Sequence, residues 1–131
     1  MDYNELVKQR NEQNCFARYI GIVTTKIEKG YAEAVLTVRH EHMNTTNIVH
    51  GGCIYTLADV VTGSAVASLC NQAVTTSGEY HYLHSAKNTK QLKAYSKCIK
   101  NGKNILLFDV EIKSDDDTII GKGTFTCYRL Q

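Results

Sequence analysis

A glycine pair followed by a single helical carboxylate is the feature of this sequence with the clearest chemical meaning. Gly51 and Gly52 precede a long apolar segment, and Asp59 is the only acidic residue within that segment. Burying an unpaired carboxylate among apolar side chains is costly, by several kcal/mol. The presence of Asp59 therefore indicates a chemical role.

The residues around this segment are of types that stabilise and attack a carbonyl group. Peptide N–H groups at a helix N-terminus lack intrahelical partners, so Gly51 and Gly52 would offer donors to a developing oxyanion. The side-chain amide of Asn44 could supply a further donor to the same oxygen. Asp59 could then activate water as a general base or attack the carbonyl itself.

The spacing of these groups along the chain limits how they can cooperate. At a rise of about 1.5 Å per residue, Asp59 lies roughly 10 to 12 Å along a helix from the glycine amides, too far for both to act on one carbon. We therefore expect Asp59 of one chain to face the helix N-terminus of a second chain. Antiparallel pairing of the two helices would give two equivalent composite sites in a homodimer.

The elements that must position these residues follow from the apolar pattern and the turn residues. A short N-terminal helix, two strands, one long helix and four further strands are expected. The predicted ranges are 2–14 and 52–69 for the helices, and 20–27, 31–38, 74–83, 92–100, 104–113 and 118–129 for the strands. We expect Asp2 to cap the first helix, and the second to be buried all round because it is apolar on almost every side. This order predicts an α+β domain over residues 1–131, in which a curved, mainly antiparallel sheet of about six strands wraps the long helix.

Composition excludes several classes of partner. The 131 residues are 43% hydrophobic, enough for one packed core, and the formal net charge of +2 is spread along the chain. Without a long basic run we expect neither a nucleic-acid nor a membrane partner. The five cysteines contain no C-x-x-C pair, which favours reduced thiols and a cytoplasmic location. The N-terminus lacks the features of a secretory signal.

The spaced pattern Asn44-x-x-Asn47-x-x-His50-Gly51-Gly52, followed after six residues by Asp59, resembles the signature of hotdog-fold acyl-CoA thioesterases of the phenylacetate-pathway (PaaI-like) type. Segments 80–83, 100–103 and 119–125 are similar to the later strands of that family. The resemblance implies a hotdog fold and hydrolysis of an acyl-CoA to a free carboxylic acid and coenzyme A. It also implies a homodimer, often doubled to a homotetramer, with coenzyme A as part of the substrate and no separate cofactor.

The resemblance also assigns further site residues. Thr75 matches the family's serine or threonine hydroxyl that helps hold the hydrolytic water, although an ordinary strand threonine is an equal alternative. Because strand side chains alternate, we expect Ser77 on the same face as a reserve substrate-binding residue, with Thr76 facing away. The pair Ser77-Gly78 departs from the acidic or apolar pair common in the family. Asn47 replaces a usual glycine, and asparagine tolerates the left-handed backbone such a turn needs.

Each assigned residue also has a structural interpretation. His50 is most simply a residue that hydrogen-bonds the turn and holds Asn44, with direct contact to the carbonyl as the alternative. Asn44 itself could be a plain turn residue. Asp59 could be a structural carboxylate satisfied by the hydroxyl of Thr62 or Tyr55.

Other patterns carry weaker chemistry. His40 and His42 would share one strand face, yet no carboxylate or cysteine joins them at a ligand spacing, so no metal site is predicted. Cys53 lies near a helix N-terminus but has no partner base, which favours a small buried residue. Six lysines could meet coenzyme A phosphates or simply form a solvated strand face: Lys87, Lys90, Lys93, Lys97, Lys100 and Lys103.

Two further classes of function are weighed against hydrolysis. In hotdog hydratases and dehydratases, the helix carries a pattern of Asp, four further residues and then His. Here Ser64 stands at the position five residues after Asp59, and the helix contains no histidine, which disfavours this class. A non-catalytic acyl-CoA binding or sensor protein would keep the glycine turn but would need no carboxylate, so Asp59 disfavours it. The sequence leaves the identity of the acyl group open.

Overall fold

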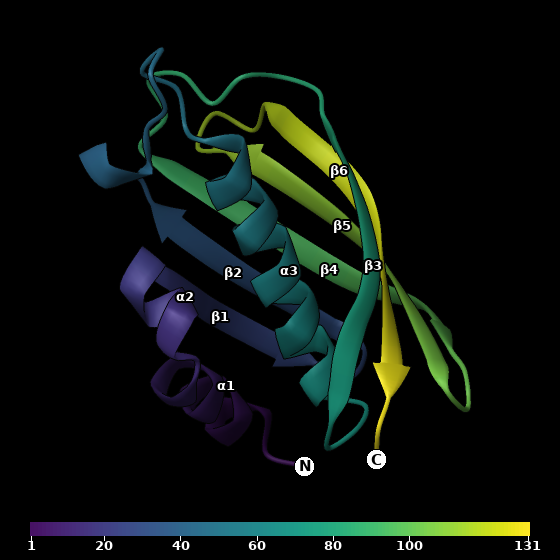
Figure 1. The fold of residues 1–131 in the computed structure, drawn as a ribbon. Coiled ribbons are helices and arrows are strands. Elements are labelled where there is room, and N and C mark those ends of the chain that lie inside the picture. Colours follow the sequence, from purple (N-terminus) through teal and green to yellow (C-terminus); the bar gives the residue numbers. More distant parts are fainter.

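Six antiparallel strands form one curved sheet around a long helix in the computed structural model, which describes residues 1–131 (Figure 1). In chain order the elements are α1 (Tyr3–Gln13), α2 (Cys15–Ile20), β1 (Ile22–Glu28), β2 (Tyr31–Thr37), the 3₁₀ helix η1 (His40–His42), α3 (Gly51–Ala67), β3 (Ala73–Tyr82), β4 (Gln91–Asn101), β5 (Ile105–Ser114) and β6 (Ile119–Arg129). The strand order is β1-β2-β4-β5-β6-β3, which places β3 at one edge. The predicted α+β architecture is confirmed.

Helix α1 is fixed to the edge of the sheet by polar contacts and by the partly buried side chains of Tyr3, Leu6 and Val7, which pack against the core. The Asp2 carboxylate accepts the backbone N–H of Glu5 at 3.2 Å, which confirms the predicted cap. None of the residues of α1 is fully buried. The Asn11 side chain also pairs with the backbone of Thr24 in β1, accepting its N–H at 2.8 Å and donating to its carbonyl at 2.9 Å.

The short helix α2 was not predicted. The Asn14 side chain caps it by accepting the N–H of Ala17 at 3.1 Å, and Gly21 ends it in the left-handed conformation with φ +97°. Both signals are present in the sequence. A helix of only six residues is too short to show a helical period of apolar residues, and its last residue, Ile20, was expected to begin the first strand.

Helix α3 lies on the concave face of the sheet (Figure 1). Its fully buried residues Leu57 and Val61 face a stretch of sheet in which Ala32, Ala34 and Ala94 are also fully buried. These alanines lie on β2 and β4, and their small side chains let the helix approach the centre of the sheet closely. No helix in the structure has the length and apolar character needed to cross a membrane.

The expectation that this helix is buried all round is wrong. A partly exposed stripe of small or polar residues runs along its length, at Gly52, Thr56, Asp59, Gly63 and Ala67. Mean hydropathy along a segment does not show such a stripe when alanine and glycine occupy it. As a result the Asp59 carboxylate lies at the surface of the single chain and not within its core.

A β-bulge in β3 changes which side chains face the helix. Thr75 pairs with buried Cys127 of β6, but Ser77 pairs with Thr126, so β3 contains one extra residue at this point. Thr75 therefore faces inward and Ser77 faces outward. The prediction that Ser77 shares the face of Thr75 is wrong, because a bulge interrupts the alternation on which it relied.

The bulge also explains the glycine that follows it. Gly78 faces inward, where an added Cβ would meet the Tyr55 hydroxyl and would lie 2.7 Å from a ring carbon of Phe125. The Tyr55 and Phe125 rings pack against each other with centroids 5.2 Å apart, so neither can move away easily. Only glycine leaves enough room for this aromatic pair between α3 and the sheet.

The opposite orientations of Ser77 and Gly78 predict unequal responses to the same substitution. Gly78→Ala should lower the free energy of unfolding by about 1 to 3 kcal/mol through overpacking against Tyr55 and Phe125. Ser77→Ala, on the outer face, should change it by less than about 0.5 kcal/mol. Urea unfolding of both variants measures the difference. A larger loss for Ser77→Ala would contradict the placement of the bulge.

Candidate functional site

Asn44 organises the loop that leads into α3. Its Oδ1 accepts the backbone N–H of Thr46 at 2.9 Å, the Thr46 hydroxyl at 2.9 Å and the N–H of Ile48 at 3.3 Å. Three donors converge on this atom, which identifies it as the oxygen of the amide. Nδ2 has no partner within the chain and remains a free donor. The turn-forming and donor interpretations of Asn44 are thus compatible. Asn47 adopts the expected left-handed backbone, with φ 59°.

His50 caps the N-terminus of α3. Its Nδ1 accepts the backbone N–H of Gly52 at 2.8 Å, which confirms that His50 hydrogen-bonds the turn. Its ring makes no hydrogen bond to Asn44, so the expectation that it holds that residue is wrong. The cap occupies the Gly52 N–H. The expectation that this amide is free to bind a substrate is therefore wrong. The N–H of Gly51 has no acceptor within the chain.

A cavity of about 320 Å³ opens beside these donors. It brings Asn44 and Gly51 together with apolar residues of α3 and of the segment after β3. The lining residues are Asn44, Ile48, Val49, Gly51, Ile54, Tyr82, Leu83, His84, Ser85 and Ala86. Tyr82, which was not predicted as a site residue, fixes the edge of this cavity by donating its hydroxyl to the Gly51 carbonyl at 2.7 Å.

Asp59 is held by β3. The Thr75 hydroxyl donates to Asp59 Oδ1 at 3.0 Å, joining the two residues across the gap between α3 and the sheet. The alternative partners considered for this carboxylate do not bind it, because Thr62 donates to the Ala58 carbonyl at 2.9 Å and the Tyr55 ring packs on Phe125. The carboxylate is oriented by one hydroxyl, and its second oxygen is free to act on water.

The predicted residues therefore form two half-sites that do not meet within one chain. Asn44 and Gly51 line one cavity at the N-terminus of α3, while Asp59 and Thr75 meet near its middle. Gly51 and Asp59 are eight residues apart on the same helix, which separates them by about 12 Å along its axis. No residue lines both the cavity at Gly51 and the cavity at Thr75.

The other predicted candidates have structural roles. His40 and His42 were expected on a strand, but they belong to a 3₁₀ helix. Buried His42 uses both ring nitrogens on backbone groups, since Nδ1 accepts the Arg39 N–H at 2.9 Å and Nε2 lies 2.6 Å from the Ile20 carbonyl oxygen. Burial raises the pKa of the Cys53 thiol, which disfavours the thiolate that a nucleophile would need.

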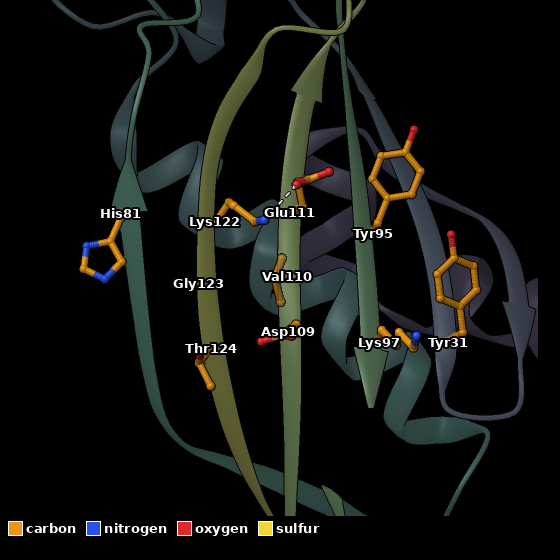
Figure 2. A pocket seen from close by; sticks show the side chains of 10 residues that line it. All are labelled: Tyr31, His81, Tyr95, Lys97, Asp109, Val110, Glu111, Lys122, Gly123 and Thr124. Carbon is orange, nitrogen blue, oxygen red and sulfur yellow. Dashed lines mark ion pairs between the residues drawn. The ribbon is translucent and has the colours of Figure 1, made fainter. Parts of the chain in front are cut away.

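A second, polar hollow lies on the outer face of the sheet, opposite α3 (Figure 2). It has a volume of about 480 Å³ and is lined by Tyr31, His81, Tyr95, Lys97, Asp109, Val110, Glu111, Lys122, Gly123 and Thr124. Lys122 pairs with Glu111 at 3.3 Å, and Figure 2 shows His81 pointing away from that pair. Of the six lysines considered for coenzyme A, only Lys97 lines this hollow. None of the predicted catalytic residues does.

Comparison with known protein sequences identifies relatives over most of the chain. The sequence model of the Thioesterase superfamily matches residues 46–120. A putative esterase of Archaeoglobus fulgidus is 29% identical over 105 residues, covering 80% of this chain and 68% of the relative. The acyl-coenzyme A thioesterase PaaI of Escherichia coli is 27% identical over 101 residues, covering 77% of this chain and 72% of the relative.

Solved structures confirm the predicted hotdog architecture. The E. coli PaaI protein superposes with a TM-score of 0.90 at 22% identity, covering 99% of this chain and 97% of that one. A hypothetical thioesterase of Streptococcus pneumoniae, solved with coenzyme A, gives a TM-score of 0.78 at 27% identity, with 82% of this chain and 84% of that one covered.

The capping role of His50 predicts a change in stability that does not depend on catalysis. His50→Ala removes the acceptor for the Gly52 N–H and should lower the free energy of unfolding by about 1 kcal/mol. His50→Ser supplies another capping oxygen and should retain most of that stability. Urea unfolding measures both, with exposed His40→Ala as the matched control. Equal losses for the Ala and Ser variants at position 50 would contradict the capping role.

Proposed function

The chain belongs to the thioesterase superfamily, and we propose that it hydrolyses an acyl-CoA thioester to a free carboxylic acid and coenzyme A. The observation that carries this proposal is the hydrogen bond from Thr75 to Asp59, because it orients a carboxylate beside a free stretch of the helix surface. The named activity of the E. coli relative supports the same reaction, as does the coenzyme A in the S. pneumoniae structure.

The first half-site stabilises charge. Attack on a thioester carbonyl develops negative charge on its oxygen, and fixed donors aimed at that oxygen lower the barrier. We assign this role to the Gly51 N–H and to Asn44 Nδ2, whose residues both line the same cavity. The positive end of the α3 dipole acts in the same direction. The bonds that fix Asn44 Oδ1 within the loop hold its amide in place, so the donor is preorganised.

The second half-site supplies the hydrolytic water. We assign Asp59 as the general base, because the Thr75 hydroxyl occupies one carboxylate oxygen and leaves the other free to take a proton. The lone pairs of the Thr75 hydroxyl can accept a hydrogen bond from the same water. Direct attack by Asp59 on the carbonyl would use the same free oxygen and remains the alternative mechanism.

We propose that two chains complete the site. Strand β3 carries Thr75 and lies at the open edge of the sheet, whereas β1 at the other edge has α1 and α2 beside it (Figure 1). An open edge presents unpaired backbone groups to a second copy of the same strand. A twofold axis there would set the two α3 helices antiparallel and bring each Asp59 towards the partner's oxyanion donors. The family resemblance supports this homodimer and its doubling to a homotetramer.

The five unpaired cysteines suit the reducing cytoplasm.

Replacing Asp59 tests the proposed chemistry. Asp59→Asn removes the base while keeping the size of the side chain, and should lower kcat for acyl-CoA hydrolysis by at least about 100-fold. Asp109→Asn, which changes a carboxylate on the outer face of the sheet, should leave turnover nearly unchanged. Release of free thiol from a panel of acyl-CoA thioesters is the measurement. Normal turnover by folded Asp59→Asn would refute the mechanism, and binding without turnover by the wild type would indicate a sensor.

A mixed dimer tests the composite site. Asn44→Asp keeps the oxygen that accepts from Thr46 and Ile48 but removes the Nδ2 donor, so kcat should fall by about 10² without loss of the loop. In a heterodimer of Asp59→Asn and Asn44→Asp chains, one site carries both lesions and the other carries neither. Co-expressed, purified heterodimers should therefore regain activity towards half that of the wild-type dimer. Heterodimers as inactive as both parents, or a fully active monomer, would contradict the shared site.

A further inference from the structure

Arg10 extends from α1 to the central helix, although α1 itself has no fully buried residue. Its Nε donates to Ser64 Oγ at 3.3 Å, and the Ser64 hydroxyl lies 2.7 Å from Thr24 Oγ1. The guanidinium rests against the helix at Gly63, where an added Cβ would lie 2.7 Å from Nη2. The neighbouring residue Asn11 binds the backbone of Thr24. The hydrogen-bonded chain from Arg10 through Ser64 to Thr24 is therefore anchored to α1 a second time, at Thr24.

This cation has no ionic partner within the chain. The ion pairs of the structure do not include Arg10, and neither Nη1 nor Nη2 has a hydrogen-bond acceptor. Burial lowers the pKa of Arg10, and the negative charge of Asp59 opposes that shift. A partly buried guanidinium with unused donors is costly to maintain. Such a group is expected where an anion binds.

Arg10 borders a cavity that reaches Thr75, the residue whose hydroxyl binds the Asp59 carboxylate. This cavity has a volume of about 270 Å³, and both Arg10 and Thr75 line it. Asn71 and Gln72 add polar groups to its wall, in contrast to the mainly apolar cavity at Gly51. Gly63 lies one helical turn beyond Asp59, about 6 Å along the axis. The guanidinium at Gly63 is therefore separated by about one helical turn from the carboxylate that would activate the water, a span that a short acyl chain can bridge.

We propose that this cavity receives the acyl group and that Arg10 binds a carboxylate at its far end, so that the preferred substrates are coenzyme A thioesters of short dicarboxylic acids. This inference rests on the proposed thioesterase function. The phosphates of coenzyme A are the other anions of the substrate, but the whole pantetheine arm separates them from the thioester. They cannot reach a cation one helical turn from Asp59. Arginine presents its donors in a fork that matches a carboxylate, which suits this role.

Paired substrates test this specificity. Glutaryl-CoA and valeryl-CoA differ in the terminal group of the acyl chain, a carboxylate in one and a methyl in the other. The wild type should favour glutaryl-CoA in kcat/KM. Arg10→Met should lower kcat/KM for glutaryl-CoA by about 30-fold or more and affect valeryl-CoA much less, as expected when one partner of a buried charge pair is removed. Arg10→Lys should retain part of the preference, and exposed Lys8→Met on the same helix should leave it unchanged.

The ratio of the two kcat/KM values separates specificity from a structural role. An equal loss on both substrates, or a ratio unchanged in Arg10→Met, would overturn the proposal and leave Arg10 as a residue that docks α1. Calorimetric titration with free glutarate gives a second measurement that needs no turnover: the wild type should bind it and Arg10→Met should not. If glutarate binds through Arg10 but no acyl-CoA is hydrolysed, the thioesterase function fails while the anion site stands. If hydrolysis occurs but neither glutarate binding nor the ratio depends on Arg10, only the inference fails.

Discussion

The fixed rise of helix α3 is the constraint on which the rest of the structure depends. The helix carries the proposed oxyanion donor at its first residue, Gly51, and the carboxylate of Asp59 eight residues later. A helix packed on a sheet along its length cannot bend enough to bring these groups together. In the proposed mechanism the chemistry is therefore divided between two chains, and the surface that presents each half has to remain open in the single chain. The exposed stripe on α3 and the open edge at β3 both satisfy this requirement.

The sheet positions the carboxylate through a local irregularity. A regular strand would put every second residue of β3 against the helix, but the bulge after Thr75 moves Ser77 to the outer face. Thr75 then reaches Asp59, while Gly78 leaves room for the rings of Tyr55 and Phe125. The same strand thus provides a polar contact at one point and close aromatic packing three residues later. Bulges beside active sites commonly redirect a side chain in this way.

Local patterns were sufficient to predict much of this molecule. Asp2 as a helix cap, the long helix, the six strands and the left-handed Asn47 each follow from the types of neighbouring residues. Features that depend on contacts between distant segments were not predictable from one sequence. The family resemblance predicted that Thr75 helps hold the hydrolytic water, but its hydrogen bond to Asp59 was not predicted. The hydroxyls of Thr62 and Tyr55, named as structural partners of Asp59, do not bind it. The bulge that reorients Ser77 has no signature in sequence alternation.

The capping of Gly52 shows a further limit. A pair of adjacent glycines suggests two equivalent free amides, but the ring of His50 lies over the second amide and leaves only the first. Which donor stays free depends on side-chain geometry at the helix N-terminus, and a histidine is an unusual cap. A hydrogen bond that stabilises the helix thereby also determines which amide stays free for the proposed oxyanion. Stability and chemistry are linked at this residue, because the same cap holds the first turn of α3 in position.

The N-terminal helix links stability and chemistry over a longer distance. Helix α1 has no fully buried residue, and it is held by the partly buried side chains of Tyr3, Leu6 and Val7 together with the Asn11 pairing to Thr24 and the Arg10 contact with Ser64. Segments held by few buried apolar contacts open locally at a lower free energy than the core. Arg10 lines the cavity from α1, which has no fully buried residue, whereas Asp59 lies on α3, the helix with the most buried residues. An anion bound at Arg10 would add a contact that exists only when α1 is docked, so ligand binding would stabilise α1 and its dock on β1 together.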